Sequence, residues 1–582
     1  MKFLPIKILM VTAVALPLIS QAQQPVLNTG GTLSGGIESN TAWYNRYDKK
    51  FQYASEKRLA SNNYLKLEYR QGKFIAGAQY EFYRPQALLG YNDRWDASYG
   101  LATYYATFQS EKFEATIGSF YDQFGNGLVY RSWEDRQLGL NNATFGARVI
   151  YRPNDEITFK AIRGKTRDYF GKSDGLITGV DAEVGLNKML NIKSKFNYSV
   201  GSSILVRTEL GHALDEDNNP SRNTVAESVR LSMSGNKFSI NGEYAHKGRD
   251  AMYVSAIDQV LYYSEHPDGN AYLLNATYSG KRVGTNITLR KMRNMEFRAS
   301  RISQGTDQLL NYLPALTPQH HYALQNIYAY AARGTYSFGD ATSQKKIVNV
   351  GEIGGQADVY INFPKKSKLG GKYGMKLSLN ASQYYGLDFR HPHPPKADFE
   401  QGAYLDKLNY KEFTPGSLLY RDMGFELEKT FSKSFKGILT YSYINWKGGI
   451  IQAGDPFADY TIANFVALDG LYKIDKKHSV QLDVQHLWAA RDFQGRGNWA
   501  AATAEVNFAP LLSVYVSDQW NYDNDIKDSR IHYYTAGTAA TYKTARLSVA
   551  YGRQRDGLLC VGGVCRLVPK SSGFTASFNY SF

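Results

Sequence analysis

Residues 73–82 read KFIAGAQYEF, and their character alternates at every second position. Apolar side chains fill the even positions from Phe74 to Phe82, and the odd positions include Lys73, Gln79 and Glu81. Successive side chains of a strand point to opposite faces, so the stretch predicts a strand with one apolar face. The same period recurs in segments of about ten residues, which lie at 145–151, 196–206, 328–338, 375–381, 435–443, 480–484, 512–516 and 547–551. An all-β chain is therefore expected.

The breaks between these segments are of two kinds, and the two kinds alternate. Short polar breaks lie at 71–72, 110–112, 235–236, 280–281, 509–510 and 543–544. Long breaks lie at 46–60, 84–97, 121–142, 245–268, 291–325, 386–417, 447–461, 522–530 and 553–572. Tight turns at one end of the strands and long loops at the other are typical of a transmembrane β-barrel.

The strand number follows from the count of such segments. About 25 segments have strand character, and both chain ends are expected on one side of the membrane, which requires an even number. Residues 345–352 are expected to form an additional strand before 356–363. The prediction is thus a single large antiparallel barrel of about 26 strands, within a range of roughly 22 to 26.

Composition agrees with this architecture and excludes several others. The 582 residues are 43% hydrophobic and 21% charged, with 45 Tyr and 52 Gly. The aromatic content argues against disorder, and no later stretch is long and apolar enough for a membrane-spanning helix. Two Cys are too few for a disulfide-based scaffold. The net charge of +15 indicates anionic partners without identifying them.

The N-terminal residues have the pattern of a signal peptide. Lys2 and Lys7 precede the apolar run 8–19, and Ser20 and Ala22 supply small residues before a cleavage position. We therefore expect a signal peptide over 1–22, a barrel over 23–582, and export through the periplasm to the outer membrane. The alternative is a buried N-terminal helix. Since only 23–31 precede the first expected strand, 32–44, no separate plug domain is expected, and the bore would hold water unless its loops fold inward.

The last strand carries a family resemblance. Phe574, Ala576, Phe578, Tyr580 and Phe582 alternate with polar residues up to the end of the chain. Here the chain resembles Gram-negative outer-membrane β-barrel proteins, whose terminal strand commonly ends in an aromatic residue that the assembly machinery reads. In its Tyr and Asn content it also looks like large porin-like barrels of Bacteroidota. The resemblance implies that Phe582 is an assembly signal, and that outer-membrane lipid and the barrel assembly machinery are partners.

Charged residues within strands are expected to face the lumen, because Lys or Arg at the bilayer midplane costs about 2–4 kcal/mol. The candidates are Lys66, Glu68, Arg70, Asp181, Glu183, Asp422, Glu426, Glu428, Asp483 and Arg546. Both signs occur among them. The lumen is then either a generally solvated polar wall or a set of charge rings that select permeants.

The loop 121–142, YDQFGNGLVYRSWEDRQLGLNN, holds the candidate pore constriction. A Gly-Asn-Gly bend precedes Arg131, Trp133, Glu134, Asp135 and Arg136. The loop resembles the region of alginate-export porins in which a Gly turn leads into an Asp-Glu-Arg cluster near a constriction. Arginine forks suit the carboxylate of a sugar acid. The hypothesis is that this loop folds into the bore, and the alternative is an internally ion-paired loop.

Other candidate chemistry is sparse. Cys560 and Cys565 flank Val-Gly-Gly-Val, and an exported chain favours a disulfide between them. His320-His321 and the HPHPP run 391–395 are weak metal-site candidates, so neither a metal nor a cofactor is expected. No nucleophile elbow, phosphate loop or HExxH pattern occurs, and we do not expect an enzyme.

The sequence favours a porin-like channel for small hydrophilic solutes, with saccharides or anionic sugar acids as candidates, since tyrosine rings stack on sugars. One alternative is a non-transporting barrel subunit or scaffold that binds a partner through its long loops. A second is a barrel hydrolase that assembles Ser, His and an acid across strands. Nucleic acid is not an expected partner, because the basic residues are dispersed along the chain.

Overall fold

The computed structural model describes residues 30–45, 48, 58–209, 222–257, 260–266, 268–303, 308–311, 321–328, 330, 351–390, 409–447, 460–492, 496–561 and 564–582. The signal peptide expected over 1–22 lies outside these residues. Among the described residues, no helix is long and apolar enough to cross a membrane.

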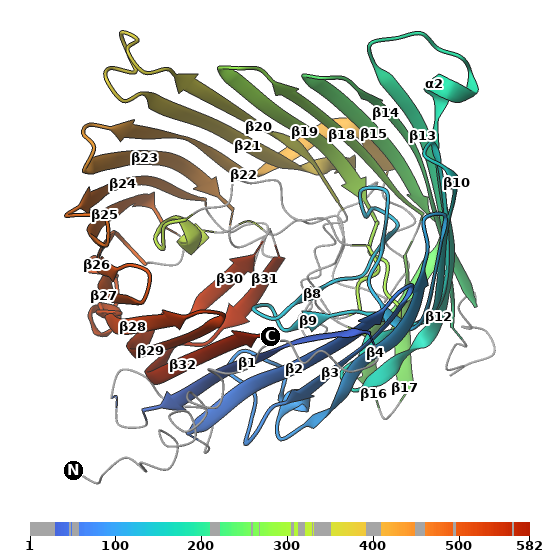
Figure 1. Cartoon of the computed structure of the whole chain (residues 1–582), viewed down its shortest axis with the longest axis horizontal. Helices are drawn as coiled ribbons and strands as arrows, with labels where there is room; N and C mark the ends of the chain where they lie inside the picture. Colours follow the sequence, from blue (N-terminus) through green and yellow to red (C-terminus); the bar gives the residue numbers. More distant parts are fainter. Residues whose placement is uncertain are drawn as a thin grey trace.

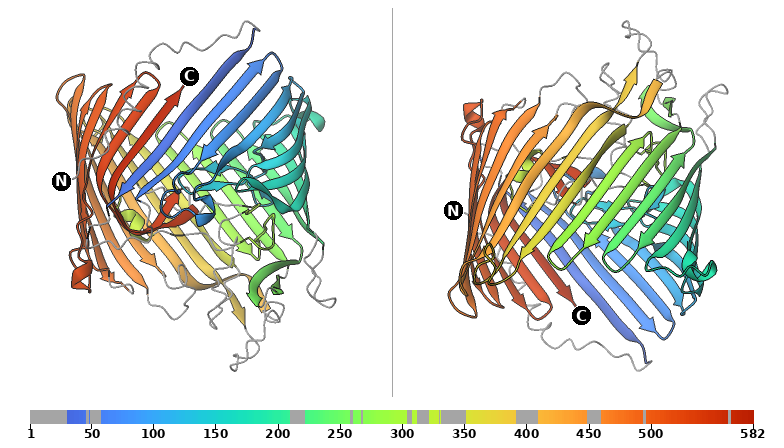
Figure 2. Two further views of the ribbon diagram at one scale, coloured as in Figure 1. Left: turned by 90° about the horizontal axis from the view of Figure 1, so that it is seen from below. Right: turned by 90° about the horizontal axis from the view of Figure 1, so that it is seen from above.

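The described chain forms one closed antiparallel barrel of 24 strands, in which the first strand pairs with the last. Figures 1 and 2 show the ring of strands and their tilt. The strands are β1 (Thr32–Tyr44), β2 (Leu59–Gln71), β3 (Phe74–Phe82), β4 (Tyr99–Gln109), β5 (Phe113–Phe120), β10 (Thr144–Asn154), β11 (Ile157–Asp168), β12 (Gly171–Gly185), β13 (Asn197–Thr208), β14 (Asn223–Ser234), β15 (Phe238–Lys247), β18 (Gly269–Ser279), β19 (Val283–Arg293), β20 (Gly351–Phe363), β21 (Met375–Arg390), β22 (Asn409–Thr430), β23 (Phe435–Trp446), β24 (Thr461–Lys473), β25 (His478–Arg491), β26 (Trp499–Phe508), β27 (Leu512–Trp520), β28 (Thr535–Tyr542), β29 (Ala545–Gln554) and β32 (Ser571–Ser581).

Smaller elements lie in the connections. The two-stranded hairpins are β6 (Gln123–Phe124) with β7 (Tyr130–Arg131), β8 (Glu134–Asp135) with β9 (Leu140–Asn141), β16 (Asp250–Ile257) with β17 (Val260–His266), and β30 (Gly557–Val561) with β31 (Val564–Val568). The short helices are η1 (Asp93–Trp95), α2 (Leu186–Met189), η3 (Gln325–Tyr328) and η6 (Lys527–Ser529).

The all-β barrel is confirmed, and its 24 strands fall within the predicted range of 22 to 26, two fewer than the predicted number of about 26. Among the described residues, two of the predicted strands are not observed as separate strands. Gly351 and Glu352 open β20 instead of closing a separate strand, and 345–350 lie outside the described residues. The strand predicted over 328–338 is wrong at its start, because Tyr328 ends η3. Alternating Tyr and Ala residues suit any segment that packs one side against a wall, so the period alone did not identify a strand.

The outer surface of the barrel is apolar. Ile117 is 73% exposed and Leu231 63%, whereas Arg230, the sequence neighbour of Leu231 on the opposite face, is buried. Leaving such a side chain in water would forgo about 1.5–3 kcal/mol each, so lipid is the solvent that fits this face. The aliphatic band includes Ile117, Val180, Ile204, Val229, Leu231, Leu274, Ile287, Leu289, Leu379, Leu468, Leu482, Val484, Val514, Val516 and Val549.

Exposed aromatic residues border this band at both ends. Such girdles mark the two membrane–water interfaces of a barrel. At the end where the short turns lie, the girdle includes Phe74, Phe113, Tyr151, Phe159, Tyr278, Phe435, Tyr472, Phe508 and Tyr542. At the opposite end, it includes Phe82, Tyr99, Tyr244, Trp488, Trp520 and Phe574. We name these ends the turn end and the loop end.

Several long connections fold into the barrel, the β30–β31 hairpin among them (Figure 1), and we name two of these connections the inner segments. The first inner segment is 121–143, between β5 and β10, and the second comprises the described residues of 294–330, between β19 and β20. Figure 1 shows β8, β9 and η3 inside the ring of strands. Each segment buries apolar side chains against the wall. The cluster around the first segment includes Phe124, Leu128, Val129, Tyr130, Ile177, Leu205, Met292 and Phe297. The cluster around the second includes Tyr322, Leu324, Ile327, Tyr328, Tyr330, Trp446, Phe465 and Leu487.

Candidate functional site in the barrel lumen

The first inner segment approaches the wall through its glycine bend. Gly125 and Gly127 have φ of +51° and +90°, values that favour glycine. A Cβ atom at Gly125 would lie 2.5 Å from Cδ of Arg230 on β14. Next to the bend, the backbone N–H of Asn126 donates to Glu243 Oε2 on β15 at 2.9 Å. The bend therefore seats the segment directly on β14 and β15.

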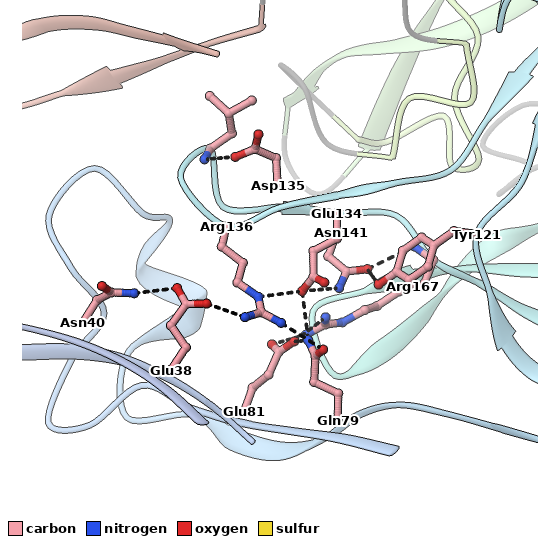
Figure 3. Close-up of polar contacts among 12 residues, drawn as sticks. Glu38, Asn40, Gln79, Glu81, Tyr121, Glu134, Asp135, Arg136, Asn141 and Arg167 are labelled. Atoms are coloured by element: carbon pink, nitrogen blue, oxygen red, sulfur yellow. Dashed lines mark hydrogen bonds and ion pairs between the residues drawn. The ribbon is translucent and has the colours of Figure 1, made fainter. Parts of the chain in front are cut away.

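Arg136 ties the same segment to the other side of the lumen (Figure 3). Its guanidinium reaches Glu38 Oε2 on β1 at 2.5 Å, Gln79 Oε1 on β3 at 3.2 Å and its own neighbour Glu134 at 3.3 Å. It also lies 4.4 Å from the ring centre of Tyr64. Burial alone would lower the pKa of Arg136, but Glu134 and Glu38 outweigh it and raise the pKa above its usual value. The arginine is thus held charged, and each of its three nitrogens bonds to a protein group.

A second ion pair lies behind Arg136 (Figure 3). Arg167 of β11 donates to both oxygens of Glu81 on β3, at 2.9 and 2.7 Å. Gln79 Nε2 joins the two pairs, donating to Glu81 Oε1 and to Glu134 Oε1, each at 2.8 Å. The loop charges are therefore part of a network anchored on β1, β3 and β11.

The remaining constriction candidates have different surroundings. The Arg131 guanidinium lies 4.8 Å from the Trp133 ring, and its backbone N–H donates to Leu310 O of the second inner segment at 2.7 Å. Asp135 accepts the N–H of Leu138 at 2.9 Å and so shapes the β8–β9 turn. The structure brings Glu134 and Arg136 to the wall, Arg131 and Trp133 to each other, and leaves Asp135 within its own turn.

The second inner segment is clamped by aromatic side chains. The Tyr330 ring stacks between those of Tyr384 and Tyr420, with centroids 5.0 and 5.1 Å away. Its hydroxyl donates to Glu352, which also pairs with Arg290, and both members of that pair are fully buried. Stacked rings of this kind contribute about 0.5–1.5 kcal/mol per pair beyond area burial.

At the loop end, the same segment joins a buried ion network. Arg207 of β13 pairs with Asp250 at 2.5 Å, and Arg301 Nε lies 3.5 Å from the same oxygen. Arg207 also donates to the backbone oxygen of Arg298 at 3.0 Å. Burial alone would raise the pKa of Asp250, but the cations, Arg207 foremost, lower it to about 2.

Strand register places the ten charged wall candidates on the lumen face. Lys66, Glu68 and Arg70 share a face of β2 with Tyr64, the residue under Arg136. The ion pairs and hydrogen bonds of the set include Glu68–Arg70 at 3.6 Å, Asp181–Arg230 at 2.6 Å, Ser199–Glu183 at 3.2 Å, Tyr420–Asp422 at 3.2 Å, Glu428 with Lys376 at 3.2 Å and Lys436 at 2.8 Å, and Gln485–Asp483 at 2.8 Å. Arg546 occupies a lumen-facing position of β29, opposite Asn579.

Glu426 and Asp483 lie near the second inner segment. Burial is the main cause that raises the pKa of Tyr322 to about 12, and Asp469, Glu426 and Asp483 add to the rise. Three wall carboxylates therefore face one tyrosine of that segment.

Sequence reasoning missed the wall partners Glu38, Gln79, Glu81 and Arg167. Gln79 and Glu81 lie on the polar face of the alternating stretch 73–82, so their position in the lumen could be predicted from the sequence. Their partners were not, since Arg167 lies 86 residues from Glu81. The second inner segment had a usable signal: the apolar residues in 321–330 are unusual for a solvated loop.

Cys560 and Cys565 are paired directly opposite each other in the β30–β31 hairpin. Their side chains lie outside the described residues, so the disulfide stays a prediction. His320, His391 and His393 also lie outside. Within the described residues, no group of three or more His, Cys, Asp or Glu could hold a metal ion.

Phe582 extends the closing pair of strands. Its N–H donates to Gly35 O at 3.0 Å and its carbonyl accepts from Gly35 N at 2.9 Å. A Cβ at Gly35 would lie 2.6 Å from the Phe582 ring, so the glycine leaves room for the terminal aromatic. Its reading by the assembly machinery stays a prediction.

Several solved barrel structures are similar to this chain. The translocation pore of the P pilus usher PapC matches with 10% identity and a TM-score of 0.42, covering 94% of this chain and 100% of that one. Acinetobacter baumannii OccAB3 matches with 10% identity and a TM-score of 0.36, covering 94% and 99%. The siderophore receptor PirA of Pseudomonas aeruginosa matches with 8% identity and a TM-score of 0.36, covering 94% and 80%.

No curated protein matches the chain. A family model does, over residues 3–582, so the chain belongs to the family described as a family of unknown function, DUF6029.

Proposed function

We propose that the protein is an outer-membrane, porin-like channel for small hydrophilic solutes, with a bore narrowed by its two inner segments. The lipid-facing aliphatic band and the two aromatic girdles support insertion in a membrane, and the polar lumen wall supports a water-filled path. In such barrels the short turns face the periplasm and the long loops face outward. We therefore place the turn end on the periplasmic side.

The contact between Arg136 and Glu38 carries the proposal. It joins the first inner segment to β1, while Asn126 joins the same segment to β15. The segment thus crosses the lumen between two distant parts of the wall. A loop fixed at both sides sets the width and local charge of the bore, which is what a constriction does.

A cavity at the loop end supports saccharides as the solute class. It has a volume of about 410 Å³ and lies between the second inner segment and the wall. That volume lies within the range of small-molecule sites. Its lining includes the residues Tyr44, Asn326, Gln519, Gln554 and Ser571. Aromatic faces with amide and hydroxyl groups suit saccharides.

Sugar acids would use a different arginine from the one expected. The donors of Arg136 are already engaged by Glu38, Glu134 and Gln79. Arg555, however, lines the cavity, and burial together with the nearby charge of Arg496 lowers its pKa to about 10. A bound carboxylate would relieve that repulsion.

Single-channel recording in planar bilayers tests the proposal. Arg136→Ala, alone and with Arg131→Ala, releases the contact with the β1 wall and is expected to raise conductance or shift ion selectivity measurably. Arg282→Ala, in an exposed turn, is the matched control and should leave both unchanged. Unaltered conductance and selectivity in the double variant would refute the constriction.

The alternative is a non-conducting scaffold, and the two apolar clusters in the lumen favour it. Segments packed so firmly against the wall can close a bore. A wild-type protein that does not conduct, and stays closed in Arg136→Ala, would support this alternative.

A further inference from the structure

The turns of the barrel hold most of its excess positive charge. Eleven turns, 48 residues in all, contain sixteen Lys and Arg but four Asp and Glu, a net charge of +12 in a chain whose total is +15. The cations are Lys73, Lys112, Lys188, Lys193, Lys195, Lys237, Lys281, Arg282, Lys365, Lys366, Lys368, Lys372, Lys433, Lys476, Lys477 and Lys543. These residues are dispersed along the sequence, but barrel closure gathers them into one ring, the basic turn ring. The dispersal of basic residues along the sequence therefore does not extend to their placement in the folded barrel.

The charges of this ring are available to an outside partner. All sixteen side chains are exposed. Among the described residues, Lys188 is the one member with an ion pair, to Glu156 at 3.0 Å. Exposed like charges held close together raise the local potential and attract anions.

The ring lies at the level where a membrane has its headgroups. The nine turn-end girdle aromatics named above lie within four strand positions of a turn, and six of them flank a turn that contains a basic residue. The same turns also expose apolar side chains, among them Met189 at 61%, Leu190 at 58%, Leu369 at 60% and Phe431 at 58%. Aromatic belts lie at the interface, and lysine stems extend from it so that the ammonium reaches the phosphate layer.

The distribution of the ring favours lipid over a docked protein. Nine of the eleven turns contribute at least one cation, so the charge surrounds the barrel instead of forming a patch on one sector. Fifteen of the sixteen are lysines. Lysine acts as a mobile point charge, whereas arginine is preferred for fixed, bidentate recognition. A continuous layer of phosphodiesters around the barrel matches both features.

We infer that the basic turn ring binds the headgroups of anionic phospholipids in the leaflet at the turn end, and so enriches them around the barrel. This inference rests on the membrane insertion in the proposed function and not on conduction. Channel recordings can therefore refute the channel without refuting lipid binding, and lipid measurements can refute lipid binding without refuting the channel.

Lipid selectivity measured on the full chain tests the inference. The refolded protein is reconstituted in phosphatidylcholine bilayers with trace spin-labelled phosphatidylglycerol or spin-labelled phosphatidylcholine, and the motionally restricted fraction gives their relative association. Near-surface cations attract anionic lipid, so at low salt we expect phosphatidylglycerol to associate at least about threefold better. At 1 M salt, where the Debye length is about 3 Å, the preference should fall close to one.

A four-lysine variant locates the effect. Changing Lys365, Lys366, Lys368 and Lys372 to Gln removes a quarter of the ring and should lower the preference at least about 1.5-fold. The matched control changes four lumen-facing cations near the same end, Lys66, Lys376, Lys436 and Arg546, to Gln. It should keep the wild-type preference. Heat-modifiable migration in gels checks that each variant folds.

Several results would overturn the inference. One is equal association of the two lipids with the wild type at low salt, and another is a preference that 1 M salt leaves intact. An equal loss in both variants would assign the effect to net charge. If the four-lysine variant kept the wild-type preference, the basic turn ring would not be the lipid-binding surface, and a different partner, such as an acidic protein, would be indicated.

Discussion

The turn end and the loop end of the barrel use charge in opposite ways. The eleven turns carry a net charge of +12 in 48 residues, whereas the twelve connections at the loop end hold 25 cations and 28 acids in 216 residues. At the loop end, described charges such as Glu81, Arg167, Arg207 and Asp250 are buried and paired. At the turn end, the cations are exposed and fifteen of the sixteen lack an ion pair in the described chain. Charges at the loop end hold the inner segments, and those at the turn end face outward to a partner.

The largest effect on stability should come from breaking a buried pair at the loop end. Glu81→Ala leaves the buried guanidinium of Arg167 without its bidentate partner. Removing one member of a buried pair typically costs about 3–5 kcal/mol. Urea unfolding of the reconstituted protein is expected to show a loss of that size. Lys476→Gln in an exposed turn is the control and should change stability by less than about 0.5 kcal/mol. Similar losses of stability in Glu81→Ala and Lys476→Gln would contradict the idea that only the charges at the loop end stabilise the fold.

A smaller effect should appear as a pH dependence. The pKa of Asp250 is about 2 in the folded protein, below its ordinary value of 3.8. A lowered carboxyl pKa contributes stability that is complete above 3.8 and is lost as pH falls through about 2. The contribution is about 2 kcal/mol. Unfolding midpoints of the wild type should therefore fall in this pH window, and Asp250→Asn should be less stable at neutral pH but flatter in the window. An equally steep fall in the variant would contradict the assignment.

The barrel could be predicted from the sequence because the side chains of a strand alternate between its two faces, so the apolar face appears at every second residue. The pattern in 73–82 is observed as β3, and the first expected strand coincides with β1. The two-residue period predicted a strand wrongly at Tyr328. The Tyr328 ring packs against that of Trp446 with centroids 5.3 Å apart, and such packing needs one apolar side of the segment but no strand conformation. The partners of Arg136 and Arg167 could not be read, because closure alone brings β1, β3 and β11 around one loop.

The basic turn ring could also be predicted from the sequence, but only by counting charged residues separately for each end of the barrel. Each turn has few cations: 364–374 holds four and 186–196 three, and no other turn holds more than two. The alternation of short and long breaks already assigns every turn to one end of the barrel. The ring becomes apparent when charge is added up by barrel end instead of along the chain.

The smallest effect should come from an acid within the ring, and it separates pairing from burial. The pKa of Asp475 is also about 2, lowered first by its hydrogen bond with His478 at 2.7 Å and then by two backbone N–H groups. Asp475 is fully exposed, so water and salt screen these contacts. Asp475→Asn should therefore leave the unfolding midpoint unchanged at neutral pH, unlike Asp250→Asn. Because it removes one of four acids from the ring, it should slightly raise the preference for phosphatidylglycerol. If Asp475→Asn instead destabilised the protein as strongly as Asp250→Asn, the charge pairs at the turn end would contribute to folding stability. The turn end would then not differ from the loop end in its use of charge.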